Sequence, residues 1–318
     1  MTDWRPAATP EVLQRRARML ADIRAFFAAR HVLEVQTPVL STRGNPDAAI
    51  DSLHCEVRVP GVAAEARYYL HTSPEFAMKR LLAAGSGDIY QICPVFRDGE
   101  AGRYHNPEFT LLEWYRLGFD YQRLMDEVAA LLRRLLGAQL PERRLAYRDA
   151  FLEYLGVDPA RLDVAALRRL ASDRGLDVSG LELDRDAWLN LLMSHCIEPG
   201  FPRETLLFVH DWPASQASLA RLSADGSAER FELYLNGVEL ANGFSELRDV
   251  DEQRRRFEQD NQRRRASGQP VIPLDEAFLA ALEAGLPECA GVAVGVDRLL
   301  MLATHGEHLH DVLSFPIA

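Results

Sequence analysis

One short stretch, FELYLNGVEL from Phe231 to Leu240, limits what this chain can fold into more than any other. Two alternating apolar runs meet there at Asn236-Gly237. Asn-Gly is the strongest short-range hairpin signal, because both central residues of the favoured turn need a positive φ. We therefore expect two adjacent antiparallel strands, which excludes an all-helical fold and a purely parallel sheet.

The two-residue turn also predicts which side chains share a face. The expected cross-strand pairs are Leu235 with Val238, Tyr234 with Glu239, and Glu232 with Ala241. Alternation places Glu232, Tyr234, Glu239 and Ala241 on one face, and Phe231, Leu233, Leu235 and Leu240 on the core face. The two carboxylates would be diagonal neighbours about 7–8 Å apart at the backbone. Such a pair can bind Mg²⁺ and leave its other coordination positions free for substrate phosphates. A solvent-facing strand is the plainer interpretation, and the pattern alone favours it.

The other predicted elements define the fold class. Helices are expected from Thr9-Pro10-Glu11 onward, from Ser73 to Gly85, from Asp120 to Gly137, and over 249–267, 275–284 and 298–303. Strands are expected over 31–40 with an interruption at Pro38, and over 53–59, 89–96, 108–116, 206–212 and 291–295. Strands outnumber βαβ units, which indicates an α+β fold with an antiparallel sheet flanked by helices. We expect one domain over 1–318 with a helical insert at about 145–200.

Composition excludes several classes of protein. The net charge is -11, which disfavours extensive contact with a polyphosphate backbone. No apolar run is long enough to span a bilayer, and the N-terminal segment does not resemble a signal peptide. The four cysteines are scattered without a CxxC pair, which argues against a disulfide framework or a zinc site. These features predict a cytoplasmic protein that has no membrane contact.

The strand over 108–116 carries a carboxylate in apolar surroundings. Phe109, Leu111, Glu113 and Tyr115 share one face by alternation. A carboxylate between a Leu and aromatic rings is costly unless a cation meets it. A salt bridge at the rim with a nearby Arg and a pocket for a ligand ammonium group explain this pattern about equally well.

Two arginines are candidate phosphate ligands. Arg97 follows an apolar strand directly, and Arg298 begins a helix behind the Gly-spaced strand with Gly291 and Gly295. The guanidinium group of Arg can form bidentate hydrogen bonds with a phosphate, although an Arg at a strand end is commonly a surface residue. The chain has no GxxxxGK[ST] loop, no GxGxxG fingerprint and no GxSxG elbow. A nucleotide would therefore have to bind in another way.

Read together, these segments resemble the class II aminoacyl-tRNA synthetases of the lysine type. LEVQTPVL with the first helix is similar to motif 1, VFRDGEAGRYHNPEFTLLEWY to motif 2, and GVAVGVDRLLML to motif 3. FELYLNGVELANGFSEL is similar to the segment that binds metal and amino acid in that class. The short form, with PASQASLA and ELANGF, is more similar to the ligases that join (R)-β-lysine to elongation factor P. Those enzymes are lysyl-tRNA synthetase paralogues without the anticodon-binding domain.

The resemblance implies a set of roles. ATP would be bound by Arg97 at the α-phosphate, Arg298 at the γ-phosphate, and by Asp98, Gly99, His105, Asn106, Phe109, Glu239, Leu240 and Gly295, with Phe109 stacking on adenine. Ser73, Pro74 and Glu75 would meet the amino end of the substrate, and Glu113, Tyr115, Asn242 and Glu246 its side-chain ammonium. Glu232 and Glu239 would bind Mg²⁺. The implied reaction is ATP-dependent adenylation of (R)-β-lysine and its transfer to a lysine ε-amine of elongation factor P, without binding of a tRNA anticodon.

The chain departs from the pattern at four positions. Gly99, followed by Glu100, stands where both families usually have Glu, and Asp98 replaces Asn. Ala241 and Ala293 stand where lysyl-tRNA synthetases have Gly. We expect their two methyl groups to reshape the pocket wall in favour of β-lysine, because one methyl group is worth roughly 1–3 kcal/mol of discrimination.

Motif 1 forms the subunit interface in this class, so the resemblance also implies a homodimer. The first helix carries the apolar residues Leu20, Ile23, Phe26 and Phe27 that would form it. Three other interpretations remain: a truncated synthetase that charges tRNA, an amide ligase with another small acceptor, and a non-catalytic regulatory paralogue. The last of these predicts broken motifs.

Overall fold

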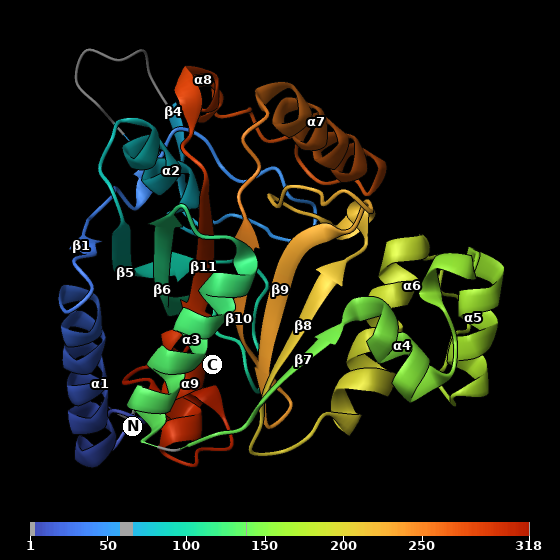
Figure 1. Ribbon diagram of the computed structural model, residues 1–318, viewed down its shortest axis with the longest axis horizontal. Helices are drawn as coiled ribbons and strands as arrows, with labels where there is room; N and C mark the ends of the chain where they lie inside the picture. The colour runs from blue at the N-terminus through green and yellow to red at the C-terminus, as the bar shows by residue number, and fades with distance from the viewer. Residues whose placement is uncertain (1–3, 58–65, 138, 318) are drawn as a thin grey trace.

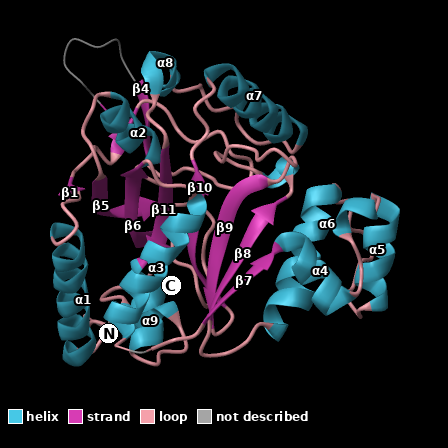
Figure 2. Cartoon of the chain, viewed as in Figure 1, coloured by secondary structure: helices cyan, strands magenta, loops and turns pink. Residues whose placement is uncertain are grey.

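The computed structural model describes residues 4–57, 66–137 and 139–317. A large sheet runs through the molecule, with helices on both sides of it and a separate group of helices at one end (Figures 1 and 2). The described part of the sheet has the strand order β1-β5-β6-β11-β10-β9-β8-β7. These strands are β1 (Leu33–Glu34), β5 (Ile89–Phe96), β6 (Glu108–Leu117), β11 (Cys289–Gly295), β10 (Val238–Ser245), β9 (Ala228–Leu235), β8 (Leu206–Trp212) and β7 (Glu142–Ala146).

The α+β class is confirmed, but the sheet is mixed. Every inner pairing is antiparallel, as expected from the hairpin. At the two edges, β1 pairs with β5 and β7 pairs with β8 in parallel. The expectation of an antiparallel sheet was therefore wrong at its edges. Local patterns do not reveal the direction in which a short edge strand returns, because that direction depends on the intervening chain.

The hairpin forms as predicted, but its register shifts after the turn. Asn236 and Gly237 have φ values of 56° and 79°, and Tyr234 pairs with Glu239. A bulge then lies between Glu239 and Ala241, so that Asn242 faces Glu232. One extra residue on a strand reverses the faces of everything that follows it. The predicted pairing of Glu232 with Ala241 was wrong, and Ala241 lies in the core at 2% exposure.

Two layers of helices enclose the sheet. On one face, α3 (Tyr121–Leu136) and α9 (Val296–Ala303) pack over the central strands, and α1 (Pro10–Ala28) packs against these two helices and β1 at the edge (Figure 1). On the other, α2 (Glu75–Ala83), α7 (Val250–Ala266) and α8 (Glu276–Gly285) pack together above β5 and β6. Alternation along β6 separates the two cores, because Trp114 joins the first cluster and Tyr115 the second.

The apolar face of α1 is used inside the subunit. Ile23, Phe26 and Phe27 are at most 2% exposed, and Phe27 stacks on Tyr90 with ring centroids 4.4 Å apart. Leu20 packs against the same cluster. Ile23, Phe26 and Phe27 are therefore unavailable to a second subunit, whereas Leu20 is half-buried, and the homodimer stays a prediction.

The segment expected over 31–40 splits at Pro38 into two very short strands. The second of these, β2 (Leu40–Ser41), belongs to a small sheet with β4 (Ala66–Leu70) and β3 (His54–Val57). The strand expected over 53–59 is confirmed as far as Val57, and residues 58 and 59 lie outside the described residues. The local sequence patterns did not predict β4 and β7.

The region from 147 to 200 is mainly helical. It contains α4 (Tyr147–Leu155), α5 (Val164–Asp173) and α6 (Arg185–Leu192), followed by a π turn at Met193–Ile197 and a 3₁₀ turn at Glu198–Gly200. Its side chains form a core with the outer face of β8, including Trp188, Phe151 and Val209. This packing brings α6 alongside the end of the sheet (Figure 1).

Candidate active site

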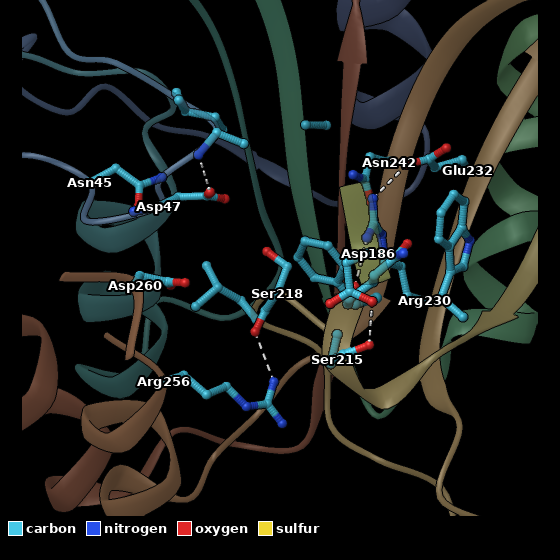
Figure 3. A pocket seen from close by; sticks show the side chains of 18 of the residues that line it. Asn45, Asp47, Asp186, Ser215, Ser218, Arg230, Glu232, Asn242, Arg256 and Asp260 are labelled. Carbon is cyan, nitrogen blue, oxygen red and sulfur yellow. Dashed lines mark hydrogen bonds and ion pairs between the residues drawn. The ribbon is translucent and has the colours of Figure 1, made fainter. Parts of the chain in front are cut away.

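A cavity of about 1120 Å³ opens between the sheet, α7 and the helical segment. Asn45 and Asp47 lie on one side of it, Arg256 and Asp260 of α7 below, and Arg230, Glu232 and Asn242 of the sheet opposite (Figure 3). Asp186 of α6 and Ser215 close the remaining side, held together by a 2.7 Å hydrogen bond. Stretches that lie far apart in the chain thus build one site.

The cavity gathers about half of the residues selected from the sequence. Ser73, Glu75, Arg97, Glu113, Tyr115, Glu232, Glu239 and Asn242 line it. Pro74 lines a smaller neighbouring pocket with Ser73 and Glu75. Asp98, Gly99, His105, Asn106, Phe109, Leu240, Glu246, Gly295 and Arg298 do not line the larger cavity, and their positions are described below.

Glu113 lies at the bottom of the cavity, at 2% exposure. Its carboxylate accepts hydrogen bonds from the hydroxyl groups of Ser73 at 2.8 Å and Tyr115 at 2.6 Å. No arginine forms an ion pair with it among the described residues. The rim salt bridge was therefore the wrong interpretation of this strand, and the geometry leaves the carboxylate directed to a pocket that would accept a cation.

A buried lysine joins two more carboxylates behind this point. Lys79, at 1% exposure, places its Nζ 2.6 Å from Glu75 Oε1 and 2.5 Å from Glu246 Oε2. The remaining Glu246 oxygen, Oε1, is buried without a hydrogen-bond partner in the described structure. Two carboxylates thus hold one fixed ammonium, and with Glu113 nearby the carboxylates outnumber the cation at this end of the cavity.

Burial and mutual repulsion alter the ionisation of these groups. Burial raises the pKa of Glu113 to about 7, with a contribution from the nearby Glu75. Burial also raises the pKa of Glu246, although Lys79 opposes that rise. Burial alone would lower the pKa of Lys79, but Glu246 and Glu75 together raise it, so Lys79 stays charged. A cationic ligand would favour the ionised form of both glutamates.

Gly291 of β11 is a glycine because protein side chains press against it. A Cβ atom there would collide with the Tyr115 ring and with Glu246 Oε1. A glycine can also let a ligand approach the backbone closely. At Gly291 the space is taken by two residues of the site itself, and at Gly295 a Cβ atom would meet the Arg298 side chain at 3.7 Å, an ordinary contact.

Arg97 reaches the cavity from the end of β5. Its guanidinium lies 5.0 Å from the centre of the Phe109 ring and 3.4 Å from Glu100. Gly99 has a φ of 75°, which a Glu would adopt only with strain. In this chain the carboxylate that contacts Arg97 belongs to Glu100, one residue after Gly99. Asp98 accepts the amide N–H of Gly99 at 2.9 Å, and its own N–H donates to Asp51.

Arg298 lies in a second polar group beside the cavity. It donates to the carbonyl oxygens of Tyr104 and Glu239, at 3.1 and 3.0 Å, and lies 2.8 Å from His105 Nε2. Its charge also lies 3.5 Å from the Glu239 carboxylate. Burial lowers the pKa of His105, and the positive charge of Arg298 lowers it further. His105 is therefore neutral at neutral pH.

Asn106 and Leu240, which were expected to contact ATP, have side chains that contact other parts of the protein. Asn106 is 3% exposed; its amide donates to Glu108 O at 2.6 Å and accepts from Ile317 N at 3.0 Å. Leu240, at 2% exposure, packs in the main core. Neither side chain is free to meet a nucleotide, so a contact of these residues with ATP would be made by their backbone, and their assignment stays a prediction.

The two hairpin glutamates lie in different surroundings. Glu232 accepts 2.5 Å hydrogen bonds from Arg230 and from Tyr234. The carboxylate of Glu239 is 41% exposed. Glu198, from the turn after α6, lies 3.3 Å from the Tyr234 hydroxyl, and burial raises its pKa to about 7, with a contribution from Glu239. Within 4–57, 66–137 and 139–317, no three acidic, His or Cys side chains form a preformed metal cage.

Sequence reasoning missed four residues of this site: Lys79, Glu198, Arg230 and Gln253. Lys79 follows Glu75 by four positions, a spacing that predicts an ion pair on a helix, but its burial depends on α8. Arg230 follows the alternation of β9 and could have been placed beside Glu232. No local signal places Glu198 or Gln253 at the cavity, because both come from helical segments that only tertiary packing brings there.

No helix in the described part of the chain combines the length and the apolar character needed to cross a membrane.

The family model described as tRNA synthetases class II (D, K and N) matches residues 1–318. An elongation factor P–(R)-β-lysine ligase of Proteus mirabilis (strain HI4320) is 51% identical over 320 residues, covering 100% of this chain and 98% of the relative. The ligase of the same name from Pectobacterium carotovorum subsp. carotovorum (strain PC1) is 50% identical over 319 residues, covering 99% and 98%. From its fold, its cavity and these similarities, the chain belongs to the class II tRNA synthetase family.

Proposed function

We propose that this chain uses ATP to activate (R)-β-lysine as an adenylate and then transfers it to a lysine ε-amine of elongation factor P. The observation that carries the proposal is the 51% identity, over essentially the whole of both chains, to ligases whose name states this reaction. Inactive paralogues lose charged residues from their sites. Here Arg97, Glu113 and Glu239 are all present around one cavity.

The charges of the cavity support a substrate with two ammonium groups and one carboxylate. Glu75, Glu113 and Glu246 carry three negative charges against the one positive charge of Lys79. Full ionisation therefore leaves two uncompensated charges, the number that a diammonium ligand supplies. Arg97 lies in the wall of the same cavity and would hold the carboxylate and the α-phosphate together.

In the first step, a carboxylate oxygen of the amino acid attacks the α-phosphorus of ATP, and pyrophosphate leaves. In the second, the neutral ε-amine of the acceptor attacks the adenylate carbonyl, AMP leaves, and the nitrogen loses a proton. Both steps depend on alignment and on charge neutralisation. Arg97 would supply the neutralisation at the α-phosphate, and Arg298, beside Glu239, at the far phosphate.

The hairpin fits Mg²⁺ in the manner of ATP enzymes. Mg²⁺ usually takes one or two carboxylates and fills its other positions with water and substrate phosphates. Glu232 and Glu239 offer two carboxylates on one face of the hairpin, and Glu239 is open to the cavity. Mg²⁺ bound there would neutralise phosphate charge.

Mass spectrometry of elongation factor P tests the proposal. The acceptor is incubated with this enzyme, ATP and either (R)-β-lysine or α-lysine. We expect a mass gain of one β-lysyl residue on one lysine, and slow or no gain with α-lysine. Charging of tRNA-Lys in a parallel reaction, without modification of the protein, would assign the chain to the truncated synthetases instead.

A cytoplasmic homodimer remains part of the proposal, because elongation factor P acts in translation and this family forms subunit contacts near motif 1. Since the apolar face of α1 is buried internally, the contact would need other residues. Light scattering at micromolar concentration tests it, and a mass of 35.7 kDa would contradict it.

A further inference from the structure

The inward face of α7 carries three polar side chains among its buried residues. Gln253, Phe257, Asn261 and Arg264 recur at steps of three and four residues and are all buried. This spacing places them on one side of the helix. Polar groups in such a position need hydrogen-bond partners, because water cannot reach them.

Two of the three polar side chains have their partners within the protein. The Asn261 amide donates to Ile272 O and accepts from Ile272 N, both at 2.9 Å. Arg264 donates to Pro270 O at 2.7 Å and to Asp51 Oδ1 at 2.8 Å. These two side chains are fully explained by the fold, since they fix the segment after α7.

Gln253 differs from both. Its exposure is 0%, and neither its Oε1 nor its Nε2 has a hydrogen-bond partner in the described structure. Exchanging the two amide atoms does not solve this, because both are unpaired. Unlike Asn261 and Arg264, Gln253 lines the cavity. An apolar side chain would cost the folded protein less at this position, so stability does not explain a glutamine there.

The surroundings indicate what the unpaired amide would bind. Gln253 shares the cavity wall with Glu75, Glu113 and Tyr115. The helix neighbours of Gln253, Val250 and Phe257, pack into the same apolar cluster as Tyr115. Gln253 therefore belongs to the end of the cavity where the carboxylates gather. A ligand group placed there is cationic, and the amide oxygen is an acceptor for its N–H groups.

We propose that Gln253 contacts the substrate and that its side-chain oxygen accepts a hydrogen bond from an ammonium group of the bound diamino acid. This inference rests on the proposed function for the identity of the ligand. Gln253 lines the cavity, but its amide atoms are buried, so its side chain would turn toward the cavity when the ligand binds. The substrate would thus provide the partner that α7 lacks in the free protein.

The test replaces Gln253 by Met, which keeps the volume and removes the amide. Calorimetry with (R)-β-lysine should show binding weakened roughly ten- to hundredfold, as for a lost hydrogen bond to a charged group. The melting temperature of the free protein should stay the same or rise, since an unpaired buried amide has been removed. The KM for ATP should change little. Gln253→Glu, which retains an acceptor oxygen, should bind the amino acid more tightly than Gln253→Met.

Gln262→Met is the matched control, because Gln262 lies on the exposed side of the same helix, away from the cavity. It should leave both binding and melting temperature unchanged. Unchanged binding in Gln253→Met would overturn the inference, as would a lowered melting temperature together with weaker binding of both substrates. If the native protein binds (R)-β-lysine but modifies no elongation factor P, the proposed function fails while the role of Gln253 stands. If the native protein binds no (R)-β-lysine, both fail.

Discussion

The two ends of the cavity hold their charges in opposite ways. At the end that we propose for the ammonium groups, Glu113 and Glu246 are each 2% exposed, and Lys79, Ser73 and Tyr115 fix them before any ligand arrives. At the end that we propose for the phosphates, the Glu239 side chain is 41% exposed, and that of Arg298, beside the cavity, is 22% exposed. Charges removed from water must be compensated within the protein, whereas exposed charges are screened by solvent.

This difference predicts where substitutions will be felt. A change at the buried end should disturb folding as well as binding, because it leaves neighbouring charges without partners. A change at the open end should leave folding intact and appear only when ATP or Mg²⁺ is bound. Five measurements test this contrast.

The largest effect is expected from Lys79→Met. It removes the only cation within hydrogen-bonding distance of Glu75 and Glu246 in the described structure, and breaking a buried pair of this kind costs about 3–5 kcal/mol. Urea unfolding measures the loss. Arg254→Met is the control, because the Arg254–Glu276 pair is exposed and should contribute about 0–1 kcal/mol. Equal losses in the two variants would refute the contrast.

Next in size is Arg97→Ala at the open end. Loss of a preorganised charge at the α-phosphate should raise the barrier to adenylate formation by about 2–4 kcal/mol, with little change in unfolding free energy. ATP–pyrophosphate exchange measures the rate. Arg103→Ala, in the same loop but outside the cavity, serves as the control. Near-normal exchange by Arg97→Ala would remove the residue from this role.

Ala293→Gly should change substrate preference. Ala293 lines the cavity and pairs with Glu113 on one side and Asn242 on the other. Removing its methyl group should change the ratio of kcat/KM for α-lysine to kcat/KM for β-lysine in favour of α-lysine, by a factor that corresponds to about 1–3 kcal/mol. Ala241→Gly should not, because the bulge turns Ala241 into the core. A substrate preference that changes in Ala241→Gly but not in Ala293→Gly would contradict the placement of Ala293, rather than Ala241, in the pocket wall.

A smaller effect is expected from Glu239→Gln. The Mg²⁺ concentration needed for half-maximal exchange should rise roughly tenfold. Loss of a residue that only supports a metal ligand already weakens metal binding by about 10- to 100-fold, so loss of a ligand should have at least the smaller effect. The melting temperature of the free enzyme should not fall, since this carboxylate is open to solvent. Glu229→Gln, whose residue pairs with Arg221 outside the cavity, is the control. An unchanged Mg²⁺ titration would count against Glu239 as a ligand.

The smallest effect is a severalfold dependence of binding on pH. Since the pKa of Glu113 is raised to about 7 in the free protein, the ionised form that a diammonium ligand needs is lost as pH falls through 7. Binding of (R)-β-lysine should weaken from pH 8 to pH 6. The free protein should behave oppositely: a raised carboxyl pKa stabilises the fold below the unfolded value and loses that contribution as pH rises through 7. Calorimetry and thermal unfolding at both pH values measure the two trends.

Local patterns were sufficient for much of the fold. The Asn236-Gly237 turn, the strand of Glu113 and the caps of the long helices depend on neighbours within a few residues, so the sequence predicts them directly. The resemblance to class II synthetases added roles for residues such as Arg97 and Glu239. It could not show that the side chains of Asn106 and Leu240 already have partners within the fold.

By itself, then, the sequence determined the α+β class, the hairpin and the carboxylates of β6 and β9, because each depends on short-range periodicity and turn chemistry. Tertiary structure alone decided the rest. The bulge in β10 arises where that strand aligns with both β9 and β11, and it moves Ala241 into the core. Lys79 meets Glu246, and Gln253 faces the cavity, only because α2, β10 and α7 pack together. Contacts between residues so far apart in the chain leave no periodic signal in either segment.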